Sequence, residues 1–160
     1  MPEQLKPAAL GYATPSGSIC PDHNRSFSGV NSGDNVITKR ECVRFSIPGT
    51  ILYYKKIPRF FGRGKYSEDY YPVLNLSRGG LKFVSDQKLG AGVSLALRIH
   101  VPGIDLYPEI LARVRWIARN PEPSYRYQTG VSFNSYGTKK NDNPEEVLAF
   151  IKALERDHGS

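Results

Sequence analysis

From about Phe45 onward, apolar and polar residues alternate with a period of two, the pattern of strands that place one face in a core. The clearest run sets Val93, Leu95, Leu97, Ile99 and Val101 between polar or small residues. The same pattern predicts strands at 110–117 and 125–133, and shorter ones at 50–54, 71–76 and 81–84. Breaks rich in proline and glycine separate these segments. The chain is therefore predicted to fold as an all-β, six-stranded antiparallel barrel, closed or nearly closed.

The two ends of the chain differ from this strand region. Residues 1–38 are dominated by Pro, Gly, Ser, Asn and Asp without apolar periodicity, so we expect a flexible N-terminal tail. Residues 142–146 offer a side-chain cap, a proline in the first turn and two acids, ahead of apolar residues at helical spacing. A C-terminal helix should therefore pack one face on the barrel. The expected organisation is a tail over 1–38 and one barrel domain with its helix over 39–156.

The formal net charge of +7 lies in one stretch of the chain. Residues 39–66 contain Lys39, Arg40, Arg44, Lys55, Lys56, Arg59, Arg63 and Lys65 against Glu41 alone, so this stretch carries the whole excess. Such a concentration of charge attracts an anionic partner such as a nucleotide, a nucleic acid or a membrane surface. A solvated basic loop is the alternative.

Other features argue against several classes of protein. No apolar run approaches the roughly 18 residues of a membrane span, and the N-terminus does not resemble a signal peptide, so we expect a cytoplasmic protein. Cys20 and Cys42 are too few for a disulfide framework and lack metal-ligand spacing, so we expect free thiols. The three histidines, His23, His100 and His158, have neither the spacing of metal ligands nor a catalytic arrangement. We therefore expect neither an enzyme nor a bound metal or cofactor.

A short polar motif, Asn75-Leu76-Ser77-Arg78-Gly79-Gly80, lies where one predicted strand ends and the next begins. Asn75 and Ser77 fall on the same side of an extended chain, so both can accept hydrogen bonds from the N1–H and N2–H of one guanine. Gly80 would supply a backbone conformation, or a close approach, that a Cβ would obstruct. The same residues also make a good tight turn, and that interpretation stays open.

Paired arginines at a spacing of four are the second candidate element. Arginine suits an anionic nucleotide because its planar fork can bind a phosphate, or the O6 and N7 edge of guanine, with two hydrogen bonds. Three pairs have this spacing, Arg40/Arg44, Arg59/Arg63 and Arg115/Arg119, so the spacing alone does not choose among them.

Taken in order, these elements resemble the PilZ family, which carries an Arg-x-x-x-Arg pair, a strand hairpin and then Asp/Asn-x-Ser-x-x-Gly. Residues 39–48 resemble the start of the family's barrel, and residues 115–133 resemble its last two strands. The Asn75 motif matches the second family motif position by position. Family order selects Arg40 and Arg44, because only this pair leaves room for two strands before Asn75.

The resemblance implies a receptor for the bacterial second messenger cyclic di-GMP, with binding rather than turnover as its activity. Arg40 and Arg44 would clamp phosphates and guanine edges, Asn75 and Ser77 would fix one base, and Gly80 would admit the ligand. Lys39 adjoins the clamp, and its charge favours two bound ligands over one. Secondary contacts are proposed at Arg78, Trp116 and Gly130. Binding would order the arm at residues 30–44, and an unidentified downstream protein would respond to that change.

Several points stay open at this stage. Asn75 replaces the commoner aspartate, a stronger acceptor, so affinity would be lower. The stretch 55–69 is an enlarged connection, either an exposed loop or a basic, aromatic contact surface for protein or nucleic acid. Trp116 could stack on a base, although an aromatic on an alternating strand face is more often part of the core. The alternative functions are a nucleic-acid-binding small barrel and a protein-interaction adaptor with degenerate ligand motifs.

Overall fold

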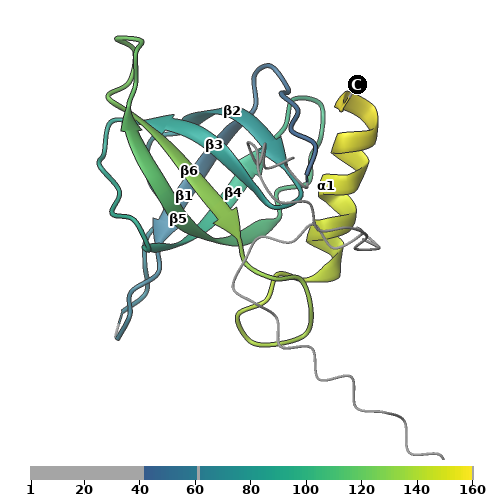
Figure 1. Ribbon diagram of the computed structural model, residues 1–160. Helices are drawn as coiled ribbons and strands as arrows, with labels where there is room; N and C mark the ends of the chain where they lie inside the picture. Colours follow the sequence, from purple (N-terminus) through teal and green to yellow (C-terminus); the bar gives the residue numbers. More distant parts are fainter. Residues whose placement is uncertain (1–41, 61, 160) are drawn as a thin grey trace, which may run out of the picture.

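The computed structural model describes residues 42–60 and 62–159, which form a closed six-stranded antiparallel barrel followed by one helix (Figure 1). The strands are β1 (Ile51–Lys56), β2 (Tyr71–Ser77), β3 (Gly80–Ser85), β4 (Ser94–His100), β5 (Glu109–Arg119) and β6 (Tyr127–Phe133), and the helix is α1 (Glu145–His158). They are ordered β1-β2-β3-β6-β5-β4 around the barrel, which closes by pairing β4 with β1. The predicted all-β barrel with a C-terminal helix is confirmed. The predicted tail at 1–38 lies outside the described residues.

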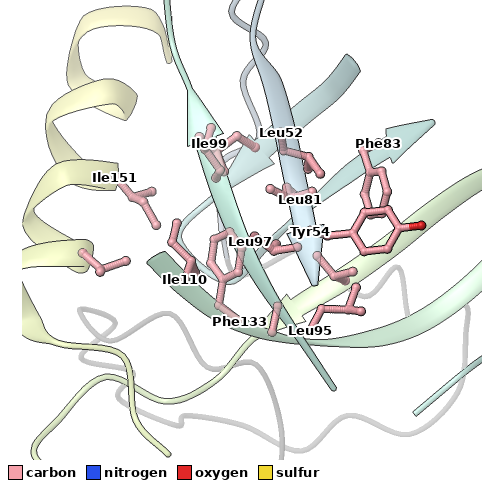
Figure 2. Packing of buried hydrophobic residues seen from close by; sticks show 14 of the residues in the cluster. Leu52, Tyr54, Leu81, Phe83, Leu95, Leu97, Ile99, Ile110, Phe133 and Ile151 are labelled. Carbon is pink, nitrogen blue, oxygen red and sulfur yellow. The ribbon is translucent and has the colours of Figure 1, made fainter. Parts of the chain in front are cut away.

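One face of each strand lines a single apolar core, as the period-two pattern requires. Leu95, Leu97 and Ile99 of β4 are fully buried, and Phe83 and Ile110 fill the core from β3 and β5 (Figure 2). Each such side chain contributes about 1.5–3 kcal/mol of burial free energy, so the barrel is a stable frame for whatever its outer face carries.

Helix α1 lies against one end of the barrel (Figure 1). Val147, Phe150, Ile151 and Leu154 belong to the same apolar cluster as the strands, and Figure 2 shows Ile151 pointing toward the barrel. Acidic residues in the first turn and basic residues in the last turn complement the helix dipole. The helix therefore shares the barrel's core.

The predicted side-chain cap of this helix is wrong. Pro144 is the N-cap and makes no side-chain hydrogen bond to the first turn. Asn143 instead is fully buried and binds the backbone of β5. Its Oδ1 accepts from the Leu111 N–H at 2.7 Å, and its Nδ2 donates to the Leu111 and Asn134 carbonyls at 2.9 and 3.1 Å. The amide that sequence reasoning placed at the helix end thus ties the chain before α1 to the barrel.

Strand β5 contains a bulge that reverses its alternation. Its pairing with β6 shifts between Val114 and Trp116, so one additional residue is accommodated there. Val114 faces the core before the bulge and Ile117 packs on the core after it, whereas Trp116 is 41% exposed. Of the two interpretations of Trp116, burial in the core is therefore wrong, because it rests on unbroken alternation across this point.

Cys42, near the start of the described chain, is bonded in a disulfide. The expectation of a free thiol at Cys42 is therefore wrong, and the expectation for Cys20 lies outside the described residues. A pair of cysteines in a sequence does not show whether they bond, since pairing depends on their separation in the fold. Within the described ranges, no helix is long and apolar enough to cross a bilayer.

Candidate functional site

The segment before β1 pairs with the end of β2 and carries Arg44 to the Asn75 motif. Phe45 and Leu76 form an antiparallel bridge, with the Phe45 N–H donating to the Leu76 carbonyl at 3.0 Å and the reverse bond at 2.8 Å. Both side chains are buried, at 5% and 3% exposure. Because neighbouring residues on a strand face opposite sides, Arg44 lies opposite Ser77 on the outer face of the barrel. The bridge therefore brings the second arginine of the first pair to the motif.

Asn75 lies next along this outer face, opposite Ser46 on the same segment. The Ser46 hydroxyl donates to the Leu74 carbonyl at 2.8 Å, a further bond that holds the segment against β2. Asn75 is half-buried, and its side-chain amide has no hydrogen-bond partner among the residues that the structure describes. Both its donor and its acceptor are thus available to a ligand.

The turn between β2 and β3 holds the other half of the motif. Ser77 pairs with Gly80 in the register of the two strands, and both residues are buried. The Ser77 hydroxyl donates to the Gly80 carbonyl at 3.1 Å. That bond uses the only proton of the hydroxyl, so the oxygen is left to accept from a donor on a ligand.

Gly80 is explained by a close approach within the protein. Its φ is not in the left-handed region, so the turn does not require glycine for its backbone conformation. A Cβ at this position would lie 2.1 Å from the Val131 carbonyl oxygen of β6. Of the two roles expected for Gly80, the close approach is the one present, and the approaching group is the backbone of the neighbouring strand.

A row of outward residues continues from Asn75 across three more strands. Asn75 pairs with Lys82 of β3, Lys82 with Gly130 of β6, and Gly130 with Trp116 of β5. A Cβ on Gly130 would lie 2.2 Å from both Cε2 and Nε1 of Trp116, so the indole ring rests directly on the glycine. The row therefore combines an amide, a half-buried cation and an exposed aromatic ring.

A second outward row runs beside the first. Ser77 pairs with Gly80, Gly80 with Ser132 of β6, and Ser132 with the exposed Arg113 of β5. Sequence reasoning did not select Lys82 or Arg113. The available signal was their position in the alternation, since Lys82 stands between the inward Leu81 and Phe83.

Arg78, at the tip of the turn, is joined to α1. Its Nε forms an ion pair with the Glu155 carboxylate, and both side chains are mostly buried. The Tyr136 hydroxyl donates to the Arg78 carbonyl at 2.6 Å, and burial raises the pKa of this tyrosine above its ordinary value of 10.0. The turn that carries the motif is thus anchored to the C-terminal helix through Arg78.

Two of the predicted ligand residues, Lys39 and Arg40, lie outside the described residues. The structure brings six of the others together on one side of the barrel: Arg44, Asn75, Ser77, Gly80, Trp116 and Gly130. This surface offers hydrogen-bond acceptors, cations and an aromatic face, the groups that recognise a phosphorylated purine. Arg78, also predicted as a secondary contact, is paired with Glu155 of α1. No group of three or more metal-ligating side chains is present in the described part of the chain.

Residues 38–150 match the PilZ domain family. The chain belongs to the PilZ family. The matched range spans all six strands and both the Arg44 segment and the Asn75 motif, so the predicted resemblance is confirmed.

Two solved structures resemble this PilZ barrel. One is the Bacillus subtilis inhibitor of motility MotI/DgrA, with a TM-score of 0.51 and 22% identity, covering 76% of this chain and 52% of that one. The other is MrkH, a c-di-GMP-dependent transcription regulatory factor, with a TM-score of 0.50 and 14% identity, covering 74% and 50%. The chain thus spans about half the length of each, and at these identities the likeness shows the fold alone. No curated protein matches the chain in sequence.

Proposed function

We propose that this PilZ chain is a receptor for cyclic di-GMP that binds its ligand on the outer face of β2, β3, β6 and β5. The observation that carries the proposal is the Phe45–Leu76 bridge, which aligns Arg44 with Ser77 and brings it close to the Asn75 amide, which no described residue binds. Membership of the PilZ family and the c-di-GMP dependence of the structurally similar MrkH support it.

Each group on this surface has a role suited to the ligand. Arg44 would bind a phosphate or the O6 and N7 edge of a guanine, and Lys39 and Arg40 would add charge to this clamp. Asn75 and Ser77 would accept from the Watson–Crick edge of one guanine. Secondary roles are proposed for three further residues: Trp116 would stack on a base, Gly130 would let its ring lie flat, and Arg78 would hold the turn in place.

Binding is proposed to order the chain before the bridge, so that the ligand acts as a switch read by an unidentified downstream protein. The Phe45 amide is already hydrogen-bonded to β2, and that pairing marks where the framework begins. A ligand that contacts both the framework and Arg40 would favour the conformation in which the preceding chain is docked. Amide exchange should then slow before residue 45 on ligand addition and stay unchanged at Phe45. Equal exchange of residues 30–44 in both states would contradict the switch.

Calorimetric titration of the full chain with cyclic di-GMP tests the receptor proposal. Saturation at one or two ligands per chain is expected, with GMP binding far more weakly. Asn75→Ala should weaken binding by about 1 kcal/mol, since one hydrogen bond is lost, whereas Ser124→Ala on the exposed β5–β6 loop should not. No saturable binding would contradict the proposal. Affinity that rises with DNA length and falls steeply with salt would favour the nucleic-acid alternative.

A further inference from the structure

The connection between β1 and β2 projects from the barrel at the side away from α1 (Figure 1). We define the basic tip as Arg59, Phe60 and Arg63 of this connection together with Lys56, the last residue of β1. All four are exposed, and the Phe60 side chain is 88% exposed. A large aromatic side chain this exposed contributes almost no burial free energy to its own fold, so the basic tip is a candidate contact surface.

The base of this connection is fixed to the barrel. The Ser67 N–H donates to the Tyr54 carbonyl at 2.8 Å, and the Tyr54 N–H donates to the Ser67 hydroxyl at 3.2 Å. The Tyr66 hydroxyl donates to the Glu109 carboxylate of β5, which also binds Lys55 at 3.1 Å. The Arg98 guanidinium stacks over the Tyr66 ring at 4.4 Å. The tip is therefore presented on an anchored stalk.

The cations of this region fall into two groups. Lys55 and Lys65 are paired, with Glu109 and Glu68 respectively. Lys56, Arg59 and Arg63 form no ion pair with any residue that the structure describes. Three cations without an ion pair in the described chain thus lie close to the exposed Phe60 in the sequence. Such a combination suits an anionic partner that has an apolar layer beneath its charges.

We infer that the basic tip binds the surface of an anionic lipid bilayer end-on. Phe60 would enter the boundary between headgroups and acyl chains, while Lys56, Arg59 and Arg63 remain at the depth of the lipid phosphates. A bilayer offers both required layers, negative charge above and apolar chains below. The inference concerns a surface separate from the proposed cyclic di-GMP site and does not rest on it.

The charges beside the tip favour a bilayer over a nucleic acid. Glu68 and Asp69 are exposed on the returning part of the connection, and Glu109 lies at its base. The phosphates of a nucleic-acid strand lying along the connection would be repelled by these carboxylates. Protein surfaces that bind nucleic acid are usually continuous basic tracks. End-on contact with a bilayer leaves the carboxylates in water.

Sedimentation of the full chain with vesicles tests the inference. Vesicles of phosphatidylcholine with about 30% phosphatidylglycerol should bind the chain, and pure phosphatidylcholine should not. Neutralising Lys56, Arg59 and Arg63 to Gln should weaken binding about a hundredfold, at about fivefold for each cation. Neutralising three exposed cations elsewhere, Lys88, Arg119 and Arg126, should have a much smaller effect. Equal losses for the two triple variants would overturn the inference, because binding would then follow net charge alone.

Phe60 provides the second arm of the test. Phe60→Ser should weaken vesicle binding at least tenfold, whereas Leu106→Ser, at an exposed apolar position on the β4–β5 loop, should not. Unchanged binding of Phe60→Ser would overturn the inference. The inference would also be overturned if the parent chain bound short duplex DNA tightly and the triple charge variant lost that binding while it still bound vesicles as the parent does.

Discussion

Arg44 and Arg59 stand in contrasting surroundings at two separate places on the barrel. Arg44 lies on a strand pair beside the acceptors of Asn75 and Ser77, held there by two backbone hydrogen bonds. Arg59 lies on a projecting connection next to the exposed ring of Phe60. The sequence presents both arginines in one continuous basic stretch, 39–66. The fold divides that stretch into a polar surface built on the framework and an apolar, basic tip outside it.

The two places also differ in how closely they are tied to the core. At the first, Ser77 and Gly80 are buried, and Arg78 is paired with Glu155 of α1. At the second, the anchoring bonds among the described residues lie at the base of the connection, between Tyr66 and Glu109 and between Ser67 and Tyr54. Substitutions at the motif should therefore change stability as well as binding, whereas substitutions at the tip should change binding alone.

The largest stability effect is expected at Gly80. Gly80→Ala should lower the free energy of unfolding by about 1–3 kcal/mol, because its Cβ would lie 2.1 Å from the Val131 carbonyl oxygen and the strands must move apart. Gly90→Ala is the control, since its Cβ would only contact Val93 at 3.4 Å. Urea unfolding measures both. Equal stability of the two variants would show that β3 and β6 are not held this closely.

A second effect is expected at the aromatic end of the row. Gly130→Ala should displace the Trp116 ring and weaken cyclic di-GMP binding by about 1–3 kcal/mol, the contribution of one stacked base. Trp116→Ala should weaken it by a similar amount. Trp116 is the only tryptophan of the chain, so its fluorescence should change in Gly130→Ala before any ligand is added. Unaltered fluorescence and affinity would remove Trp116 from the proposed site.

A smaller effect concerns pH at the anchored base. The hydrogen bond from Tyr66, with further contributions from Lys55 and Arg98, holds the Glu109 pKa below 4.5, although partial burial opposes this. A lowered pKa in the folded state stabilises the protein above pH 4.5, and that contribution is lost as pH falls through the folded pKa. Solvent screening keeps it below about 1 kcal/mol.

Glu109→Gln should therefore reduce the free energy of unfolding at neutral pH and have little effect at pH values below both the folded and unfolded pKa of Glu109. Thermal unfolding of parent and variant across this range checks the expectation. A difference between the two that grows as pH falls would contradict the assignment.

The smallest effect on stability is expected at the tip itself. Phe60→Ala should change the free energy of unfolding by no more than about 0.5 kcal/mol, because its side chain is 88% exposed. Chemical denaturation detects a larger loss readily. A loss above about 1 kcal/mol would show that Phe60 packs on the barrel and is not free for a partner.

The barrel was predictable because large buried side chains recur at every second position in β1, β4 and the first part of β5, as Leu95, Leu97 and Ile99 show. The alternation failed at Trp116, where a bulge depends on pairing with β6 and leaves no local signal in the sequence. Asn143 has the chemistry of a helix cap, yet its amide is used by the distant β5 backbone. Such choices depend on tertiary contacts that local propensity does not record.

At the candidate site, the order of the motifs along the chain predicted the motif residues. It did not predict their partners on the neighbouring strands. Lys82 lies opposite Asn75, and Arg113 lies opposite Ser132. These pairings can be predicted only when the register of β3, β5 and β6 is known. Register is fixed by which faces are buried on several strands together, so a single strand does not disclose it.

The most direct test of the central claim is a calorimetric titration of cyclic di-GMP into the parent chain, Arg44→Ala and Arg59→Ala. Arg44→Ala should bind more weakly by about 2 kcal/mol or more, roughly thirtyfold, because a charge-assisted contact in the site is lost. Arg59→Ala should bind as the parent does, since Arg59 belongs to the basic tip. Parent-like binding by Arg44→Ala, or a loss confined to Arg59→Ala, would contradict the division of the two surfaces proposed for this PilZ barrel.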